Sequence, residues 1–165
     1  MATAIFFASS TGNSEEIANK ISSELNEIEV FDLSGTKINK INDYDKLILG
    51  CSTWGDGELN DDWEDVWSDF CKLDLSSKTI ALFGLGDQES YSDEFCSALG
   101  IIYEQVNSMG ANIIGFTSRE GYYHDASKAQ IDDKFVGLVI DEDNQSDLTD
   151  ERIAKWVNEI KEDIL

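Results

Sequence analysis

Short apolar runs alternate along this chain with longer segments in which apolar residues recur every three or four positions. Continuous runs cover residues 4–8, 47–51, 79–83 and 112–116, and a less regular one covers 28–33. Short continuous runs are typical of strands covered on both faces of a sheet, and the longer period is typical of amphipathic helices. The alternation predicts an α/β fold in which a parallel sheet carries helices on both faces.

Four segments have helical periodicity. The first ends near Asn26, the third ends at Gly110, and we expect Thr149 to cap the fourth. The apolar positions of the four segments are, in chain order, Ile17, Ala18, Ile21 and Leu25; Trp63, Val66, Trp67 and Phe70; Phe95, Leu99, Ile102, Val106 and Met109; and Ile153, Trp156, Val157, Ile160 and Ile164.

The polar segment 118–134 does not fit this alternation, and a further apolar run, 135–140, follows it. We interpret the segment as an insertion that interrupts the last strand, which then resumes at Phe135. It contains the only histidine, His124. Because no Cys or His lies at ligand spacing from His124, a packing or surface role is favoured over metal binding.

Three loops follow the predicted strands at one edge of the sheet: 9–14, 52–59 and 84–91. In open parallel sheets, ligands bind beyond the carboxyl ends of the strands, where the strand order reverses. The three loops are therefore the candidate ligand site.

The first loop indicates an anion held by neutral donors. It carries four hydroxyls, one glycine and no basic side chain, in the order Ser9-Ser10-Thr11-Gly12-Asn13-Ser14. Unpaired backbone N–H groups at a helix start can hold a phosphate. The alternative is an ordinary N-cap, since Ser, Thr and Asn are the usual capping residues.

The other two loops each place one aromatic residue among small, flexible ones. Trp54 lies between Thr53 and Gly55, and Tyr91 ends the loop that contains Gly86. Glycines let the backbone approach a flat ligand, and an aromatic ring can cover its face. Beside a phosphate loop, these residues suggest a planar ring system with a phosphorylated tail. Taken singly, either aromatic could instead be a packing residue.

Charge narrows the class of partner. The 165-residue chain carries 34 acidic and 12 basic residues, a net charge of −22. Such a field repels nucleic acid and anionic membranes and attracts partners with a basic face, although acidity can also serve solubility alone. No apolar run has the length of a membrane span or the flanks of a signal peptide, so we expect one cytoplasmic domain covering 1–165. Cys51, Cys71 and Cys96 are expected to be buried free thiols.

The loop sequences Ser-Ser-Thr-Gly-Asn-Ser, Ser-Thr-Trp-Gly-Asp-Gly-Glu and Gly-Leu-Gly-Asp-Gln resemble the three cofactor loops of flavodoxins. The resemblance covers the whole chain. The segment after Tyr122, and the stretch from Lys134 through Asp141 to Gln145, are similar to the inserted loop of the long-chain bacterial subgroup. The resemblance implies a single-domain, flavodoxin-like, doubly wound fold. Its five-stranded parallel sheet would have the order 2-1-3-4-5, with the last strand split by the insertion.

The resemblance also implies a function: a low-potential carrier of single electrons, not an enzyme, that binds FMN without a covalent bond. Thr11, Asn13 and Ser14 would be the main phosphate contacts, Trp54 and Tyr91 would cover the two ring faces, and a ribose contact would come from Asp143. Backbone groups of Thr53, Gly55, Gly57, Gly86 and Asp87 would line the ring edge. The full set of implied cofactor residues is Ser9, Ser10, Thr11, Gly12, Asn13, Ser14, Thr53, Trp54, Gly55, Asp56, Gly57, Gly86, Asp87, Tyr91 and Asp143.

The implied partners are redox proteins with basic docking faces, such as an NADPH-dependent flavodoxin reductase or a 2-oxoacid oxidoreductase, and the implied state is a monomer. The main alternative is an FMN-dependent NAD(P)H oxidoreductase of the same fold. That enzyme needs a hydride-donor site, and the stretch Gly84 to Glu89 begins like a dinucleotide fingerprint but ends in Glu.

The acidic loops bear on the implied redox chemistry. At ~10 Å, each carboxylate opposes added negative charge by about 0.4–1.7 kcal/mol, so a few lower a potential by on the order of 100 mV. We also hypothesise that Gly55 turns its carbonyl towards the ring and so stabilises the neutral semiquinone, because glycine tolerates the required dihedrals. The carboxylates in or near the loops are Asp56, Glu58, Asp61, Asp62, Asp87, Glu89 and Asp93.

Overall fold

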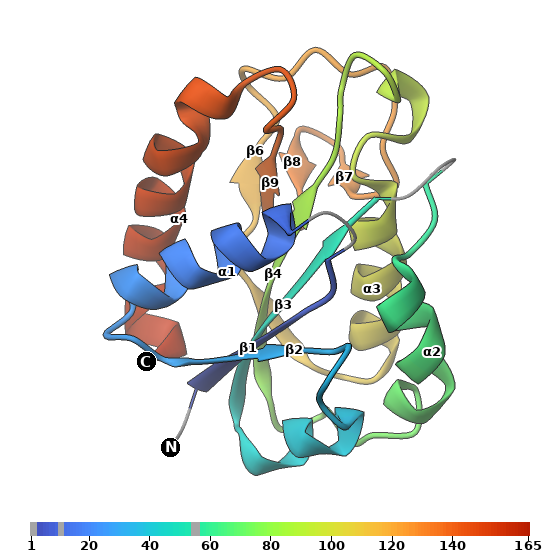
Figure 1. Ribbon diagram of the computed structural model, residues 1–165, viewed down its shortest axis with the longest axis vertical. Coiled ribbons are helices and arrows are strands. Elements are labelled where there is room, and N and C mark those ends of the chain that lie inside the picture. The colour runs from blue at the N-terminus through green and yellow to red at the C-terminus, as the bar shows by residue number, and fades with distance from the viewer. Residues whose placement is uncertain (1–2, 10–11, 54–56) are drawn as a thin grey trace.

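A computed structural model describes residues 3–9, 12–53 and 57–165, and its centre is a twisted parallel sheet (Figure 1). The strand order is β2-β1-β3-β4-β5, and β9 also pairs with β4. All these pairings are parallel, so the predicted fold class and strand order are confirmed. The strands are β1 (Thr3–Phe7), β2 (Glu29–Asp32), β3 (Lys46–Ser52), β4 (Thr79–Leu85), β5 (Asn112–Ile114) and β9 (Leu138–Ile140).

Four long helices cover the two faces of the sheet. One face carries α1 and α4 and the other carries α2 and α3 (Figure 1). The helices are α1 (Asn13–Glu24), α2 (Asp61–Phe70), α3 (Ser97–Ser108) and α4 (Thr149–Ile164). Short 3₁₀ helices are η1 (Ile38–Asp43), η2 (Ser92–Glu94) and η3 (Ser146–Leu148). Among the described residues, no helix combines the length and the apolar character needed to cross a membrane.

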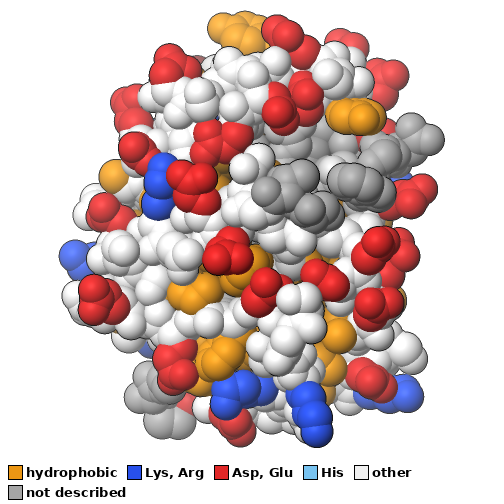
Figure 2. Space-filling model, in the orientation of Figure 1, with side chains coloured by type: hydrophobic (Ala, Val, Ile, Leu, Met, Phe, Trp, Pro, Cys, Tyr) orange, Lys and Arg blue, Asp and Glu red, His pale blue; other side chains and the backbone are white. Residues whose placement is uncertain are grey.

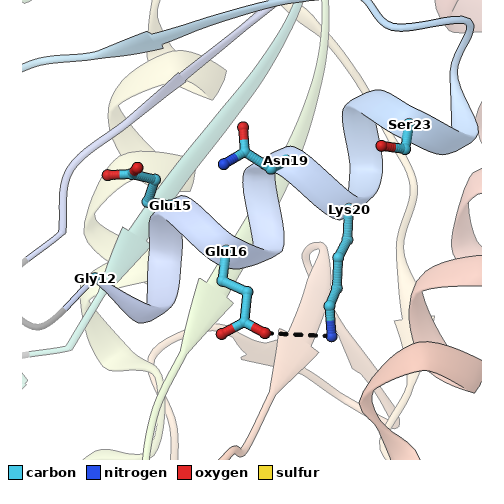
Figure 3. A pocket seen from close by; sticks show the side chains of 6 residues that line it. All are labelled: Gly12, Glu15, Glu16, Asn19, Lys20 and Ser23. Carbon is cyan, nitrogen blue, oxygen red and sulfur yellow. Dashed lines mark ion pairs between the residues drawn. The ribbon is translucent and has the colours of Figure 1, made fainter.

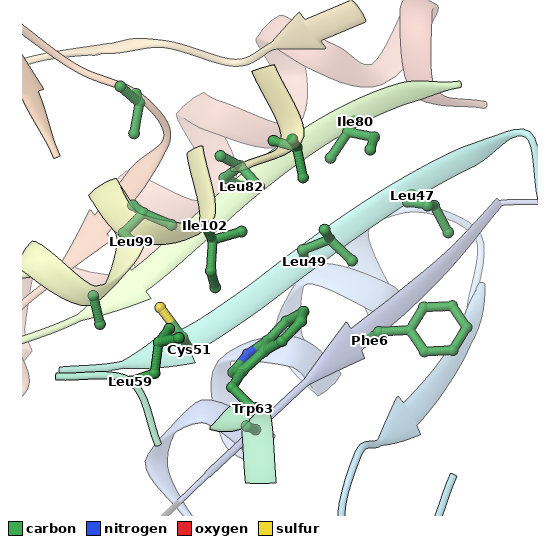
Figure 4. Packing of buried hydrophobic residues seen from close by; sticks show 14 of the residues in the cluster. Phe6, Leu47, Leu49, Cys51, Leu59, Trp63, Ile80, Leu82, Leu99 and Ile102 are labelled. Carbon is green, nitrogen blue, oxygen red and sulfur yellow. The ribbon is translucent and has the colours of Figure 1, made fainter. Parts of the chain in front are cut away.

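The side chains of each central strand divide between two buried clusters, as the alternation of a strand requires. Leu47 and Leu49 of β3 face α2 and α3, whereas Ile48 faces α1 and α4. On the first side, the fully buried Trp63 of α2 lies over the sheet and donates from Nε1 to the Gly50 carbonyl oxygen at 2.9 Å (Figure 4). Burial of each such large side chain contributes about 1.5–3 kcal/mol.

The last strand position is shared by two short strands, as the predicted insertion requires. β5 pairs with Thr79–Ala81 of β4, and β9 pairs with Phe83–Leu85. Between β5 and β9, the insertion forms a three-stranded antiparallel sheet in the order β6-β8-β7. Its strands are β6 (Thr117–Ser118), β7 (Gln130–Ile131) and β8 (Lys134–Phe135).

The prediction that the last strand resumes at Phe135 is wrong. Phe135 belongs to β8 of the insertion, and pairing with β4 restarts only at Leu138. The apolar run 135–140 covers residues of both β8 and β9, because Phe135 is buried within the insertion. Between the two strands, the backbone of Gly137 packs directly against Leu82 of β4. A Cβ on Gly137 would lie 2.1 Å from the Leu82 carbonyl oxygen, so this close packing requires glycine.

Three smaller expectations also need correction. The third helix starts at Ser97 rather than at Phe95, because Cys96 has a left-handed φ of +53° that cannot continue a helix. Thr149 does not cap α4: Leu148 is the N-cap residue, and the buried Thr149 hydroxyl has no hydrogen bond within the described chain. All three cysteines are free, but Cys71 is only partly buried. Complete burial raises the pKa of Cys51 to about 12.

Candidate functional site

The three candidate loops meet at the carboxyl edge of the sheet. The Oγ atoms of Ser14 and Ser52 lie 2.9 Å apart, which joins the first loop to the second. The Thr53 N–H donates to the Leu85 carbonyl at 3.0 Å, which joins the second loop to the third. Of the predicted site residues, Ser10, Thr11, Trp54, Gly55 and Asp56 lie outside the described residues.

At the start of α1, backbone donors are left without a partner among the described residues. Gly12 is its N-cap residue and no described side chain caps the helix. Ser9 Oγ accepts from the Gly12 N–H at 2.8 Å, and the first bond within the helix runs from Glu16 N–H to the Gly12 carbonyl. The N–H groups of residues 13–15 therefore have no partner inside the helix. This arrangement favours an anion cradle over an ordinary side-chain cap.

Ser14 is fully buried, and its hydroxyl contacts Ser52 rather than open solvent. When Ser52 donates this hydrogen bond, the Ser14 proton remains free for an anion. Ser52 is itself held by a hydrogen bond from its N–H to Asn60 Oδ1 at 2.8 Å. The phosphate loop is thus fixed against the end of β3 by neutral groups.

A pocket of about 460 Å³ adjoins Gly12 but does not suit an anion (Figure 3). It runs along the outer side of α1, where Glu15 and Glu16 contribute carboxylates. Its cation, Lys20, is paired with Asp150 at 2.9 Å and with Glu16 at 3.6 Å. The hydrogen bond to Asp150 raises the pKa of Lys20. The candidate phosphate site is therefore the helix terminus, not this pocket.

In the second loop, Thr53 and Gly57 hold the loop against the start of α3. Thr53 Oγ1 accepts from the Ala98 N–H at 3.2 Å, and the Thr53 N–H donates to Leu85, so the Thr53 carbonyl is its backbone group without a partner among the described residues. Gly57 is buried and has a φ of +91°. A Cβ there would lie 3.0 Å from Ser97 Cβ, and side chains rarely adopt this positive φ, so the position favours glycine.

In the third loop, the Asp87 side chain folds back and accepts hydrogen bonds from the backbone of its own loop. Its Oδ1 accepts from the N–H groups of Glu89 at 3.1 Å and Ser90 at 2.9 Å, and from Asn144 Nδ2 at 2.8 Å. Burial raises the pKa of Asp87, but the hydrogen bonds from Ser90, Asn144 and Glu89 outweigh it and lower the pKa overall. These three bonds engage Oδ1 and hold the Asp87 side chain against its own loop.

Tyr91 and Asp143 lie at the outer rim of this loop. Tyr91 is 49% exposed, so its ring is accessible to a ligand. The Tyr91 N–H donates to the Asp87 carbonyl at 2.9 Å. Burial raises the pKa of Asp143, and the nearby negative charges of Asp87 and Asp141 raise it further.

Sequence patterns missed two buried polar residues at the site, Asp141 and Gln88. Asp141 is fully buried and Gln88 is 3% exposed. Gln88 donates to Asp141 from both its backbone N–H and its side chain. One signal was available: Asp141 directly follows the last apolar run, and Asp often accepts from N–H groups two and three residues ahead.

Acidic side chains dominate the surroundings. They spread across the face shown in Figure 2, while several basic side chains lie along its lower end. Near the start of α2, burial and then the neighbouring Asp32, Asp65 and Asp61 raise the pKa of Asp62. The ion pairs among the described residues involve only Lys20, Lys40 and Lys72. The charges of most carboxylates are therefore not neutralised by a paired cation.

Comparison with known proteins decides the family. The family model for flavodoxin matches residues 5–156. The chain is 46% identical to a flavodoxin of Picosynechococcus sp. over 95% of this chain and 94% of that protein. It is 44% identical to Flavodoxin 1 of Escherichia coli over 98% of this chain and 94% of that protein. The chain belongs to the flavodoxin family.

A solved structure agrees with this assignment. Fusobacterium nucleatum flavodoxin bound to flavin mononucleotide superposes with a TM-score of 0.92 at 31% identity, covering 99% of both chains. Flavodoxins are electron-transfer proteins and not enzymes, so the expected class of function is confirmed. The alternative of an NAD(P)H oxidoreductase is not favoured by these relatives.

Proposed function

We propose that this flavodoxin binds FMN without a covalent bond and carries single electrons at low potential between redox enzymes. The supporting observation is the joined edge of three loops, in which the start of α1 has N–H donors with no partner, and no side-chain cap, among the described residues. The Fusobacterium nucleatum relative, folded in the same way, is bound to flavin mononucleotide. When bound, FMN supplies the one-electron chemistry, and the chain supplies binding, orientation and charge.

The proposed contacts follow the three loops. Residues Ser9–Ser14 hold the phosphate with hydroxyl and backbone donors, each charge-assisted hydrogen bond being worth about 1.5–3 kcal/mol net. Trp54 and Tyr91 cover the two ring faces, and Asp143 lies at the ribose end. The ring edge meets backbone groups of Thr53, Gly55, Asp56, Gly57, Gly86 and Asp87.

The acidic surroundings then set the potential. Carboxylates in or near the three loops, such as Asp62, Asp87 and Glu94, would oppose negative charge added at the site. At ~10 Å each costs about 0.4–1.7 kcal/mol before screening, and ~59 mV corresponds to 1.4 kcal/mol for one electron. Neutral donors at the phosphate leave this field uncompensated, which supports a low potential. The proposed role of the Gly55 carbonyl falls outside the described residues.

The same charge supports the choice of partner. A net charge of −22 favours redox proteins with a basic docking face, such as an NADPH-dependent flavodoxin reductase or a 2-oxoacid oxidoreductase, over nucleic acid or anionic membrane. We further propose a cytoplasmic monomer in which residues 1–165 form one domain. The insertion between β5 and β9 supports membership of the long-chain subgroup.

Titration of flavin-free protein with FMN tests the proposal. Flavin fluorescence should be quenched at one equivalent, and the loaded protein should be yellow and accept electrons from dithionite in one-electron steps. Protein that takes up no FMN would refute the proposal. Steady consumption of NADPH by the loaded protein alone would instead support the oxidoreductase.

A further inference from the structure

Asp141 is a buried carboxylate at the end of β9 that accepts five hydrogen bonds. Oδ2 accepts from Gln88 N–H at 3.1 Å, Gln88 Nε2 at 2.7 Å and Asn144 Nδ2 at 2.9 Å. Oδ1 accepts from the N–H groups of Asp143 and Asn144, both at 3.1 Å. Asp141 is 0% exposed and takes part in none of the ion pairs among the described residues. Its charge is therefore balanced by N–H dipoles alone.

Two of its donors connect Asp141 to other loops. Gln88 Oε1 accepts from the Tyr123 N–H at 2.5 Å, so the insertion reaches Asp141 through Gln88. Asn144 Nδ2 is shared between Asp141 Oδ2 and Asp87 Oδ1, at 2.9 and 2.8 Å. One carboxylate thus connects the insertion, the loop after β9 and the ring-side loop, residues 86–91.

These bonds account for nearly every backbone donor of the ring-side loop. Gly86 N–H donates to the Ile140 carbonyl and Gln88 N–H donates to Asp141. The N–H groups of Glu89, Ser90 and Tyr91 all donate to Asp87. Within the described chain, the Asp87 N–H alone of this loop has no acceptor. Hydrogen bonds therefore fix most of the loop backbone and leave one donor without a partner among the described residues, beside an exposed Tyr91.

We propose that Asp141 is a positioning residue for flavin binding: its ionised carboxylate holds residues 86–91 in the conformation that presents the Asp87 N–H and Tyr91 to the ring. Asp141 itself does not touch the flavin. Both oxygens accept from N–H groups, which suits a side chain that offers acceptors only. This inference rests on the proposed FMN function.

Asp141→Asn provides the test, because the amide keeps the shape but offers two donors. In either orientation, at least two N–H groups then face another N–H, and buried donors lose their acceptor. We expect flavin-free Asp141→Asn to bind FMN and riboflavin roughly 10- to 100-fold more weakly. Its affinity for inorganic phosphate should stay within twofold of the parent, because the described residues of the phosphate loop share no hydrogen bond with Asp141.

Asp147→Asn is the matched control, since Asp147 is exposed and lies six residues further along the chain. It removes the same charge without touching the network and should leave all three affinities unchanged. Should Asp141→Asn fail to fold, Asn144→Ala removes only the link between Asp141 and Asp87 from an exposed side chain. It should weaken riboflavin binding several-fold and leave phosphate binding alone.

Three results would overturn the inference: riboflavin affinity within twofold of the parent in a folded Asp141→Asn; a parallel loss of phosphate affinity, which indicates general destabilisation; or an unfolded Asp141→Asn together with an unaffected Asn144→Ala. The failure of the proposed function is distinguishable. In that case the parent protein itself binds no FMN, whereas each of the three results above is obtained with a parent that does bind it.

Discussion

At the residue scale, two glycines provide a matched test of the second loop. Gly57 has a φ of +91°, and a Cβ there would lie 2.5 Å from Glu94 Oε2 and 3.0 Å from Ser97 Cβ. Gly35 has an ordinary φ and nothing within 4 Å of its Cβ position. Gly57→Ala should lower the free energy of unfolding by about 1–3 kcal/mol, whereas Gly35→Ala should be neutral or stabilising by up to about 1 kcal/mol. Urea midpoints measure both, and equal midpoints would contradict the described geometry at Gly57.

Single residues also show what could and what could not be predicted from the sequence. The hydroxyl-rich loop could be predicted as a helix start with spare donors, because both properties are local. The partner of Ser14 could not, because Ser52 lies 38 residues away. Asp141 and Gln88 were missed for the same reason: they are separated by 53 residues, and an acidic run has no pattern that distinguishes its one buried member. Polar side chains that fix a site are found only when the fold brings them together.

At the scale of elements, the insertion is part of the core rather than an appendage. Phe135 of β8 is fully buried, and its ring lies 6.0 Å from that of Phe95, 5.0 Å from Tyr122 and 5.2 Å from His124, centre to centre. These residues connect the insertion to the segment that precedes α3. His124 therefore has the expected packing role, and its Nε2 lies 2.6 Å from Gln130 Oε1.

Phe135→Ala should therefore destabilise the whole protein. Removal of a fully buried phenylalanine costs about 3–5 kcal/mol. Tyr123, in the same insertion, is 80% exposed, so Tyr123→Ala should change the free energy of unfolding by less than about 0.5 kcal/mol. Urea unfolding followed by tryptophan fluorescence measures both. A loss below about 1 kcal/mol in Phe135→Ala would show that the insertion unfolds separately from the rest of the core.

The existence and order of the elements followed from hydrophobic periodicity, but their junctions did not. Apolar run 135–140 contains two strands that belong to different sheets, and the run is continuous because both are buried. Phe95 likewise has the spacing of α3 but lies before the left-handed Cys96 that precedes the helix. Periodicity reports burial, and burial continues across a change of backbone direction. The boundary residues therefore needed the structure.

At the scale of the whole molecule, the −22 charge opposes folding, because folding brings like charges together. Asp62 shows the effect at one residue. Burial and then Asp32, Asp65 and Asp61 raise its pKa. The folded state therefore holds the Asp62 proton to higher pH than the unfolded state does. Stability falls as pH rises from the unfolded value of about 3.9 through the folded pKa, and the full penalty is present at neutral pH.

Asp62→Asn should consequently raise the urea midpoint at pH 7, and the gain should vanish as pH falls below about 4, where the parent residue is protonated in both states.

Asp87→Asn should instead lower the urea midpoint at pH 7. Because the pKa of Asp87 is lowered, its contribution is present above about pH 4 and is lost as pH falls through the folded pKa. Raising salt from ~10 mM to ~1 M shortens the screening length from about 30 to about 3 Å, so it should stabilise the parent and shrink the gain of Asp62→Asn. The loss in Asp87→Asn should persist, because its acceptor bonds are local. A salt-independent gain in Asp62→Asn would show that its penalty comes from burial rather than from the charge of its neighbours.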